Sequence, residues 1–132
     1  MQKLTIIIER SANFYDAYAE NCYGLYGAGK TLDEVKENIM KVLRRRLKDP
    51  YFLPAILKGR FEVEFVCELP AFINHYAQKI GYVGLERITG IERTNLIEYS
   101  KGSIKPRQPT LRKMEKALHD FAAELKQTSL FN

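Results

Sequence analysis

One stretch of the chain carries residues that could bind a nucleotide. Residues 24–31, Gly-Leu-Tyr-Gly-Ala-Gly-Lys-Thr, fit the pattern G-x-x-x-x-G-K-[ST]. In a phosphate-binding loop of this kind, glycine N–H groups surround the phosphates, the lysine (here Lys30) reaches the terminal phosphates and the hydroxyl (here Thr31) binds magnesium. A strand-like stretch precedes the match and a helical pattern follows it, so the motif has part of the context that it requires.

The surrounding sequence nevertheless argues against a nucleotide site. A P-loop fold needs several buried parallel strands that read as apolar runs, whereas residues 61–66 alternate apolar residues with glutamates. No apolar run ends in an aspartate that would hold magnesium, and residues 1–68 are too few for a nucleotide-binding sheet. In a simpler interpretation, the glycines form a tight hairpin and Thr31 caps a helix. A nucleotide hydrolase that uses Lys30 and Thr31 is therefore only our third hypothesis, and nucleotide-dependent thermal stabilisation would test it.

The other reactive side chains are isolated. Cys22 and Cys67 lie far apart in strand-like stretches without a CxxC pairing, which indicates reduced, half-buried core thiols. His75 and His119 have no neighbours at a metal-ligand spacing. We expect no catalytic residue, no metal and no cofactor, and therefore no enzyme.

Length and charge limit the class of protein. The 132 residues allow one compact domain or two very small ones, and 45% hydrophobic with 28% charged residues is an ordinary globular mixture. There is no apolar run of about 18 residues and no signal-peptide pattern, so we expect a cytoplasmic protein without membrane contact. Residues 1–68 carry 11 Lys/Arg against 10 Asp/Glu, and residues 69–132 carry 10 against 6. The basic excess in the second half is compatible with nucleic-acid binding.

The first 68 residues predict a small α/β domain. Strands are expected at 3–10 and 14–22, pairing antiparallel, with a short third strand at 25–28 and another at 61–66 beyond a loop at 50–59. A helix is expected at 32–47, where Thr31 and Glu34 form a capping box. Arg44, Arg45 and Arg46 match the helix dipole, and the alternative for this run is a phosphate or partner contact. The apolar face of the helix comprises Leu32, Val35, Ile39, Val42, Leu43 and Leu47.

Residues 69–132 predict an all-helical domain, because the apolar period changes from 2 to 3.6 at Pro70. Helices are expected at 70–80, 84–89, 92–100 and 110–126. In the first, Phe72, Ile73, Tyr76 and Ile80 point inward. The last carries a stripe that we interpret as core or dimer contact, formed by Leu111, Met114, Leu118, Phe121, Ala122 and Leu125.

The spacing within residues 84–109 indicates a helix-turn-helix. Gly90 permits the left-handed conformation of a sharp turn, and Gly102 ends the following helix in the same way. The other positions of the pattern are the apolar Leu85, Ile88, Ile91 and Leu96, and Pro106 and Pro109 before Thr110, which is expected to cap the last helix.

This pattern resembles the lambda-repressor-like (Xre-type) helix-turn-helix over roughly residues 72–122. In that family the second helix of the motif enters the major groove. The resemblance implies that Arg93, Thr94 and Glu98 face base edges, with Asn95 touching base or backbone. It implies phosphate contacts by Lys101, Ser103, Lys105 and Arg107. The alternative is that these are ordinary surface residues of a helical bundle.

The first half also carries a resemblance. Gly29, Thr31 and Glu34 match the G-x-T-x-x-E-A segment of the HicB family, with Val35 at the usual Ala. The resemblance implies a partial RNase H-like β-β-β-α-β sheet without the acidic metal-binding cluster. HicB proteins are antitoxins that neutralise a small, mRNA-cleaving HicA toxin, and many carry a C-terminal DNA-binding domain and repress their own operon.

Together the two halves predict an α+β protein with a HicB-like toxin-binding domain at 1–68 and a helix-turn-helix domain at 69–132. The expected function is that of a type II antitoxin, a homodimer or higher homo-oligomer that binds a HicA-like toxin and operator DNA. The main alternative is a stand-alone transcriptional regulator whose N-terminal domain binds a ligand or protein. A fourth hypothesis is a structural interaction domain with a degenerate helix-turn-helix.

Overall fold

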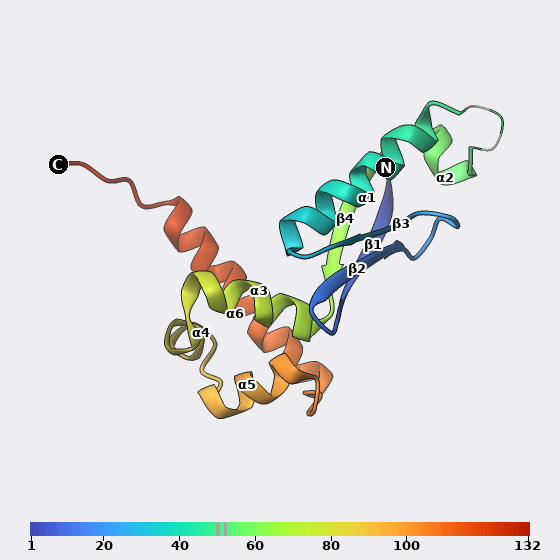
Figure 1. Cartoon of the computed structure of the whole chain (residues 1–132). Helices are drawn as coiled ribbons and strands as arrows, with labels where there is room; N and C mark the ends of the chain where they lie inside the picture. Colours follow the sequence, from blue (N-terminus) through green and yellow to red (C-terminus); the bar gives the residue numbers. More distant parts are fainter. Residues whose placement is uncertain (50, 52) are drawn as a thin grey trace. The chain divides into compact units, whose positions relative to one another are not determined.

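The computed structural model of the chain describes residues 1–49, 51 and 53–132 (Figure 1). Pro50, part of the expected loop at 50–59, lies outside the described residues. The chain divides into two compact units, Met1–His75 and Tyr76–Asn132. The sequence-based boundary lies after residue 68, seven residues before this division. None of the described helices has the length and apolar character needed to span a membrane.

The first unit contains a four-stranded mixed sheet, in the order β3-β2-β1-β4. β1 pairs antiparallel with β2, as predicted, and β2 with β3, whereas β4 runs parallel to β1. The predicted α+β class is therefore confirmed. The elements of this unit are β1 (Gln2–Ser11), β2 (Phe14–Ala19), β3 (Tyr26–Gly29), α1 (Leu32–Leu47), α2 (Ala55–Lys58) and β4 (Phe61–Cys67).

Helix α1 covers one face of the sheet (Figure 1). Thr31 caps it as predicted, its Oγ1 accepting a hydrogen bond from Glu34 N at 3.0 Å. The buried side chains on this face are Leu4, Ile6 and Ile8 of β1, Tyr15, Ala17 and Ala19 of β2, and Leu32, Val35, Ile39 and Leu43 of α1. The expected inward position of Leu47 is wrong, since this side chain is exposed, and Val42 is only half-buried. A 16-residue helix is about 24 Å long, longer than β2 and β3, so its last turn passes beyond those strands.

Two local predictions for the first unit are corrected. The expected loop at 50–59 contains the short helix α2, which begins after Pro54 and buries Leu57. Cys22 lies in the loop after β2 rather than in a strand. β2 ends before the predicted residue 22 because the Asn21 side chain, rather than its backbone, forms hydrogen bonds with β1. Its Oδ1 accepts from Thr5 N at 3.0 Å and its Nδ2 donates to Lys3 O at 2.7 Å.

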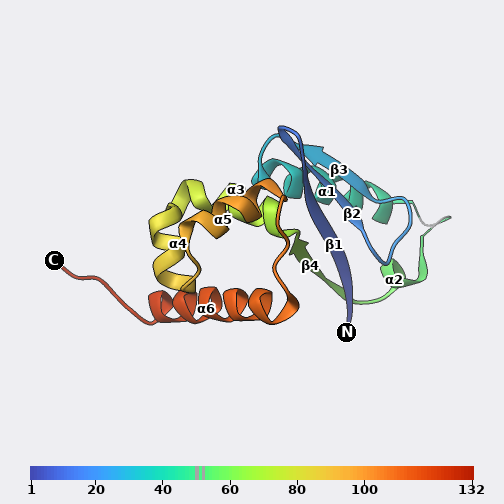
Figure 2. The ribbon, with the colours of Figure 1, turned by 90° about the horizontal axis from the view of Figure 1, so that it is seen from below.

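The second unit is helical. Its helices are α4 (Tyr82–Thr89), α5 (Arg93–Lys101) and α6 (Gln108–Lys126), and α3 (Leu69–Ile80) precedes them across the division between the units. α4 packs against both α5 and α6 (Figure 2). The buried residues here are Leu85, Thr89, Leu96, Tyr99 and Met114.

Several predicted inward positions are not buried. In α6 only Met114 is fully buried, Leu111, Leu118 and Phe121 are half-buried, and Ala122 and Leu125 are exposed. α6 has 19 residues, whereas α4 and α5 have only 8 and 9. The shorter helices therefore cannot cover the whole apolar stripe of α6. In α3, Ile73 is buried, Phe72 and Tyr76 are half-buried and Ile80 is exposed.

The expected cap of α6 is also wrong. The helix begins at Gln108 after Arg107, so Thr110 lies inside its first turn. Pro109 is tolerated there because the first N–H groups of a helix have no intrahelical acceptor.

Candidate nucleic-acid interface

A short turn at Gly90 joins α4 to α5. Gly90 adopts the predicted left-handed conformation, with φ of 74°, and its N–H donates to Glu86 O at 2.8 Å. The buried Thr89 hydroxyl donates to Leu85 O at 2.7 Å and accepts from Ile91 N at 3.2 Å. The turn is thus fixed by a glycine and by one buried side chain. Sequence reasoning missed Thr89, whose signal was a hydroxyl residue directly before the turn glycine.

Helix α5 is anchored by its apolar side and exposes the opposite side. Leu96 and Tyr99 are buried, and Gly102 ends the helix with φ of 73°. Of the predicted base-contacting residues, Arg93, Thr94 and Asn95 are exposed in the first turn, and Glu98 is half-exposed one turn later. The first turn of α5 therefore presents donors, acceptors and a methyl group to solvent.

Arg93 is held by a carboxylate from α4. Glu86 Oε2 accepts from Arg93 N at 3.0 Å, and Glu86 Oε1 lies 3.1 Å from Arg93 Nε. Glu86 therefore caps the start of α5, since the adjoining N-cap residue Glu92 makes no side-chain cap bond. A guanidinium has five N–H donors, so pairing through Nε leaves a bidentate contact through the terminal nitrogens geometrically possible.

Glu98 connects the predicted base-contacting and phosphate-contacting residues. Ser103 Oγ donates to Glu98 Oε2 at 2.6 Å and to Glu98 O at 3.2 Å. Lys101 Nζ lies 4.0 Å from Glu98 Oε1. The end of α5 is thereby a small polar cluster, in which a glutamate offsets part of the Lys101 charge.

The remaining predicted phosphate contacts lie in the segment after α5. Lys105 and Arg107 are exposed between the end of α5 and the start of α6. Residues 76–132 carry ten Lys/Arg against six Asp/Glu, which gives this unit a net charge of +4. Three of its six acidic residues, Glu86, Glu92 and Glu98, lie in α4, in α5 or in the turn between them, and they lower the positive potential there.

The phosphate-loop-like segment does not fold as a phosphate cradle. Residues 26–29 form β3, and within residues 24–31 only Gly24 has a positive φ, of 89°. The expected hairpin of glycines is therefore wrong for Gly27 and Gly29. These two allow close approach of α1: a Cβ at Gly29 would lie 2.6 Å from Val35 N, and one at Gly27 would lie 3.0 Å from Ile39 N. The backbone here is an extended strand paired with β2 rather than a loop around an anion.

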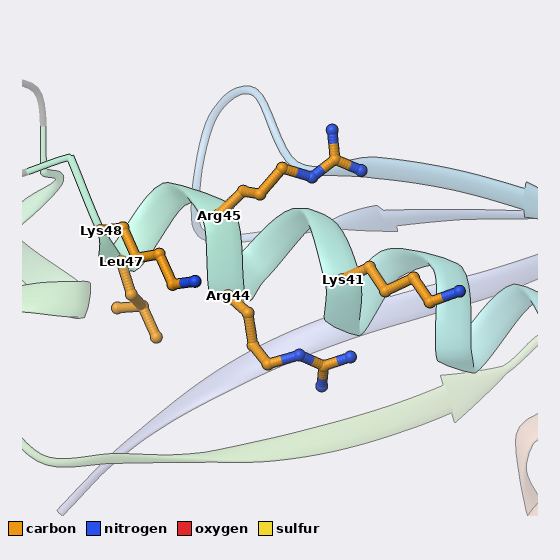
Figure 3. A pocket seen from close by; sticks show the side chains of 5 residues that line it. All are labelled: Lys41, Arg44, Arg45, Leu47 and Lys48. Atoms are coloured by element: carbon orange, nitrogen blue, oxygen red, sulfur yellow. The ribbon is translucent and has the colours of Figure 1, made fainter.

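A shallow hollow of about 470 Å³ lies on the outer side of α1 near its C-terminus. It is lined by Lys41, Arg44, Arg45, Leu47 and Lys48, and we call it the basic hollow. Arg44 and Arg45 extend to opposite sides of the helix (Figure 3). Its lining offers positive charge without a carboxylate, hydroxyl or imidazole, so it can attract anions but supplies no acid–base pair or nucleophile.

The cysteines are free thiols. Burial raises the pKa of Cys22, an effect that the Arg46 charge partly offsets, and burial likewise raises the pKa of Cys67 against the Lys36 charge. Both therefore remain protonated and weakly nucleophilic at neutral pH. Within the part of the chain that the structure describes, no three His, Cys, Asp or Glu residues gather at a metal-binding distance.

Comparison of the chain with models of known protein families, with curated proteins and with solved structures returned no match.

Proposed function

We propose that the protein is an antitoxin that binds operator DNA through α4 and α5 and neutralises a HicA-like, mRNA-cleaving toxin through its first unit. One observation supports the DNA-binding part of this proposal. α5 follows a left-handed glycine turn, is anchored by Leu96 and Tyr99, and exposes Arg93, Thr94 and Asn95 in its first turn.

In this proposal α5 enters the major groove. Arg93 binds guanine, the Thr94 methyl contacts thymine and Glu98 accepts from cytosine, while Asn95 touches base or backbone. Phosphate contacts by Lys101, Ser103, Lys105 and Arg107 fix the register of the helix. A homodimer places two copies of α5 about 34 Å apart, which matches successive turns of a palindromic operator.

The toxin-binding half has separate support. The first unit has the order β1-β2-β3-α1-α2-β4 and is followed by helices. Apart from the short helix α2, this is the β-β-β-α-β order that the HicB resemblance implies. We propose that the first unit covers the active site of the toxin in the cytoplasm, and that toxin binding tunes repression by coupled binding. The protein itself then performs no catalysis.

The DNA-binding half is tested with a sequence that the protein itself selects. The full chain is used to enrich binding sites from random duplex DNA, and the affinity for the enriched site is measured for Arg93→Ala and for the control Arg60→Ala in the first unit. We expect Arg93→Ala to weaken specific binding by roughly 1–3 kcal/mol and Arg60→Ala to leave it unchanged. Equal affinities would support a structural domain with a degenerate helix-turn-helix.

The toxin-binding half is tested by capture of the tagged full chain from its host. We expect a small basic protein that cleaves mRNA and is silent in the complex. Recovery of DNA without any protein partner would instead support the stand-alone regulator.

A further inference from the structure

The face of the sheet away from α1 carries an apolar row that crosses all four strands. The strand register places Ile7 opposite Val66 on one side and Tyr18 on the other, and Tyr18 opposite Tyr26. Val66 is 39% and Tyr26 61% exposed, and Ile7 and Tyr18 are half-buried. The apolar row Val66–Ile7–Tyr18–Tyr26 spans three inter-strand spacings, about 14 Å.

Acidic residues flank this apolar row on both sides. On one side Glu9 lies opposite Asp16, a like-charged pair that costs stability in an isolated sheet. On the other side Thr5 lies opposite Glu64, and Glu20 N donates to Thr5 O at 2.8 Å. Lys3 pairs with Glu64 at 3.3 Å, so one of these charges is offset.

Tyr18 shows that carboxylates from both sides come near the apolar row. Its hydroxyl donates to Glu9 Oε1 at 3.4 Å. Its pKa is raised, first by partial burial of the ring and then by the negative charges of Glu9, Glu20 and Glu68. The phenol therefore stays protonated and can donate a hydrogen bond across the whole physiological range.

We propose that this face, the apolar row with its flanking carboxylates, is the docking surface of the first unit for a basic protein. Charge complementarity selects the partner. Lysine and arginine side chains would neutralise the facing carboxylates, and apolar side chains between them would cover Ile7, Tyr18 and Tyr26. Nucleic acid is disfavoured here because its phosphates would meet the carboxylates.

The opposite side of the unit has the opposite charge. The basic hollow on α1 carries four cations, Lys41, Arg44, Arg45 and Lys48, and would repel the same partner. The inference rests on the proposed function in one respect, namely that the first unit binds a protein; it adds which surface does so and which charge the partner carries.

The test is site-specific cross-linking of the full chain in its host. A photoreactive amino acid replaces Val66 or Tyr26 in the apolar row. The controls are Leu47 in the basic hollow, 39% exposed like Val66, and Tyr51, which is 87% exposed. We expect one and the same basic protein, identified by mass spectrometry, to be attached at Val66 and Tyr26 and not at the controls.

Affinity of the purified pair then measures the contribution of the face. Glu20→Lys combined with Glu64→Lys should weaken binding at least tenfold, and Tyr26→Ser about tenfold. Glu37→Lys combined with Glu124→Lys makes the same charge change on helices, and Tyr51→Ser removes a ring elsewhere; both should leave affinity unchanged. Thermal unfolding of each variant confirms that it folds.

The outcomes separate this inference from the proposed function. The docking surface is overturned if a partner is attached mainly at Leu47 or Tyr51, or if Glu20→Lys combined with Glu64→Lys leaves the affinity unchanged. Either result leaves the antitoxin proposal standing. Attachment of Val66 and Tyr26 only to a second copy of this chain also overturns the docking surface. No protein attached at any of the four positions overturns both the docking surface and the toxin-binding half.

Discussion

Replacing Glu86 by alanine should loosen the start of α5. Its carboxylate makes two contacts with one residue, accepting from Arg93 N at 3.0 Å and pairing with Arg93 Nε at 3.1 Å. The first contact satisfies one of the N–H groups that a helix start leaves without an acceptor. Removal of Glu86 therefore breaks a helix cap and an ion pair together.

The expected loss in the free energy of unfolding follows from these two contacts. Loss of a side-chain cap costs about 1 kcal/mol. The ion pair adds between about 0 and 1 kcal/mol, since the side chains of Arg93 and Glu86 are 56% and 32% exposed and solvent screens their attraction. Glu86→Ala should thus lower the free energy of unfolding by about 1–2 kcal/mol. In a unit of this size each 1 kcal/mol corresponds to a fall in Tm of roughly 4–8 °C.

The assay is urea unfolding of the full chain followed by circular dichroism at two salt concentrations. Glu86→Gln keeps a neutral acceptor for Arg93 N, so it should lose about half as much as Glu86→Ala and should lose the salt dependence. Glu115→Ala, at an exposed position of α6, is the control. The reasoning is refuted if Glu86→Ala changes stability no more than Glu115→Ala, or if a double-mutant cycle of Glu86→Ala with Arg93→Ala is additive.

Three further predictions concern packing, the turn and pH. Gly29→Ala should cost about 2–3 kcal/mol in unfolding experiments, because its Cβ would lie 2.6 Å from Val35 N, whereas Gly59→Ala, with no atom within 4 Å, should stay within about 0.5 kcal/mol; equal effects would contradict this. Thr89→Val should cost about 1–3 kcal/mol by denaturant unfolding, since it removes a buried hydroxyl with two backbone hydrogen bonds, and a neutral result would show that the turn does not need them. The raised pKa of Cys22 predicts slow alkylation by iodoacetamide up to its ordinary pKa of 9.0. The thiol of the unfolded chain ionises at a lower pH than the folded one, so the contribution of protonated Cys22 to the free energy of unfolding is complete below pH 9 and is lost as pH rises through the folded pKa. Alkylation as fast as that of the unfolded chain would be the contrary result.

Local signals predicted the elements that are determined by neighbouring residues. The α1 helix begins and ends where the sequence placed it, because Thr31 caps one end and an apolar residue recurs every third or fourth position up to Leu43. The turn and the end of α5 were predictable because Gly90 and Gly102 occupy a conformation that other residues adopt at a cost. The sequence missed α2, since four residues are too few to show a helical period.

Contacts between residues far apart in the chain could not be predicted from the sequence. The parallel pairing of β4 with β1, which brings Val66 beside Ile7, joins segments far apart in the chain. The pairing of Glu86 with Arg93 likewise depends on the angle between two helices, which composition and spacing do not specify. Gly29 has a regular strand conformation and is required only because α1 passes close to it.

The position of β1 at the centre of the sheet has a consequence for synthesis on the ribosome. β1 is made first, yet its parallel neighbour β4 begins only at Phe61, opposite Gln2. At about 5–20 residues per second, several seconds separate the two strands. During this interval the β1–β2 hairpin can form by itself, but the edge of β1 that later pairs with β4 remains open to pairing with other chains. Completion of β4 therefore limits how soon a newly made chain can present the finished sheet.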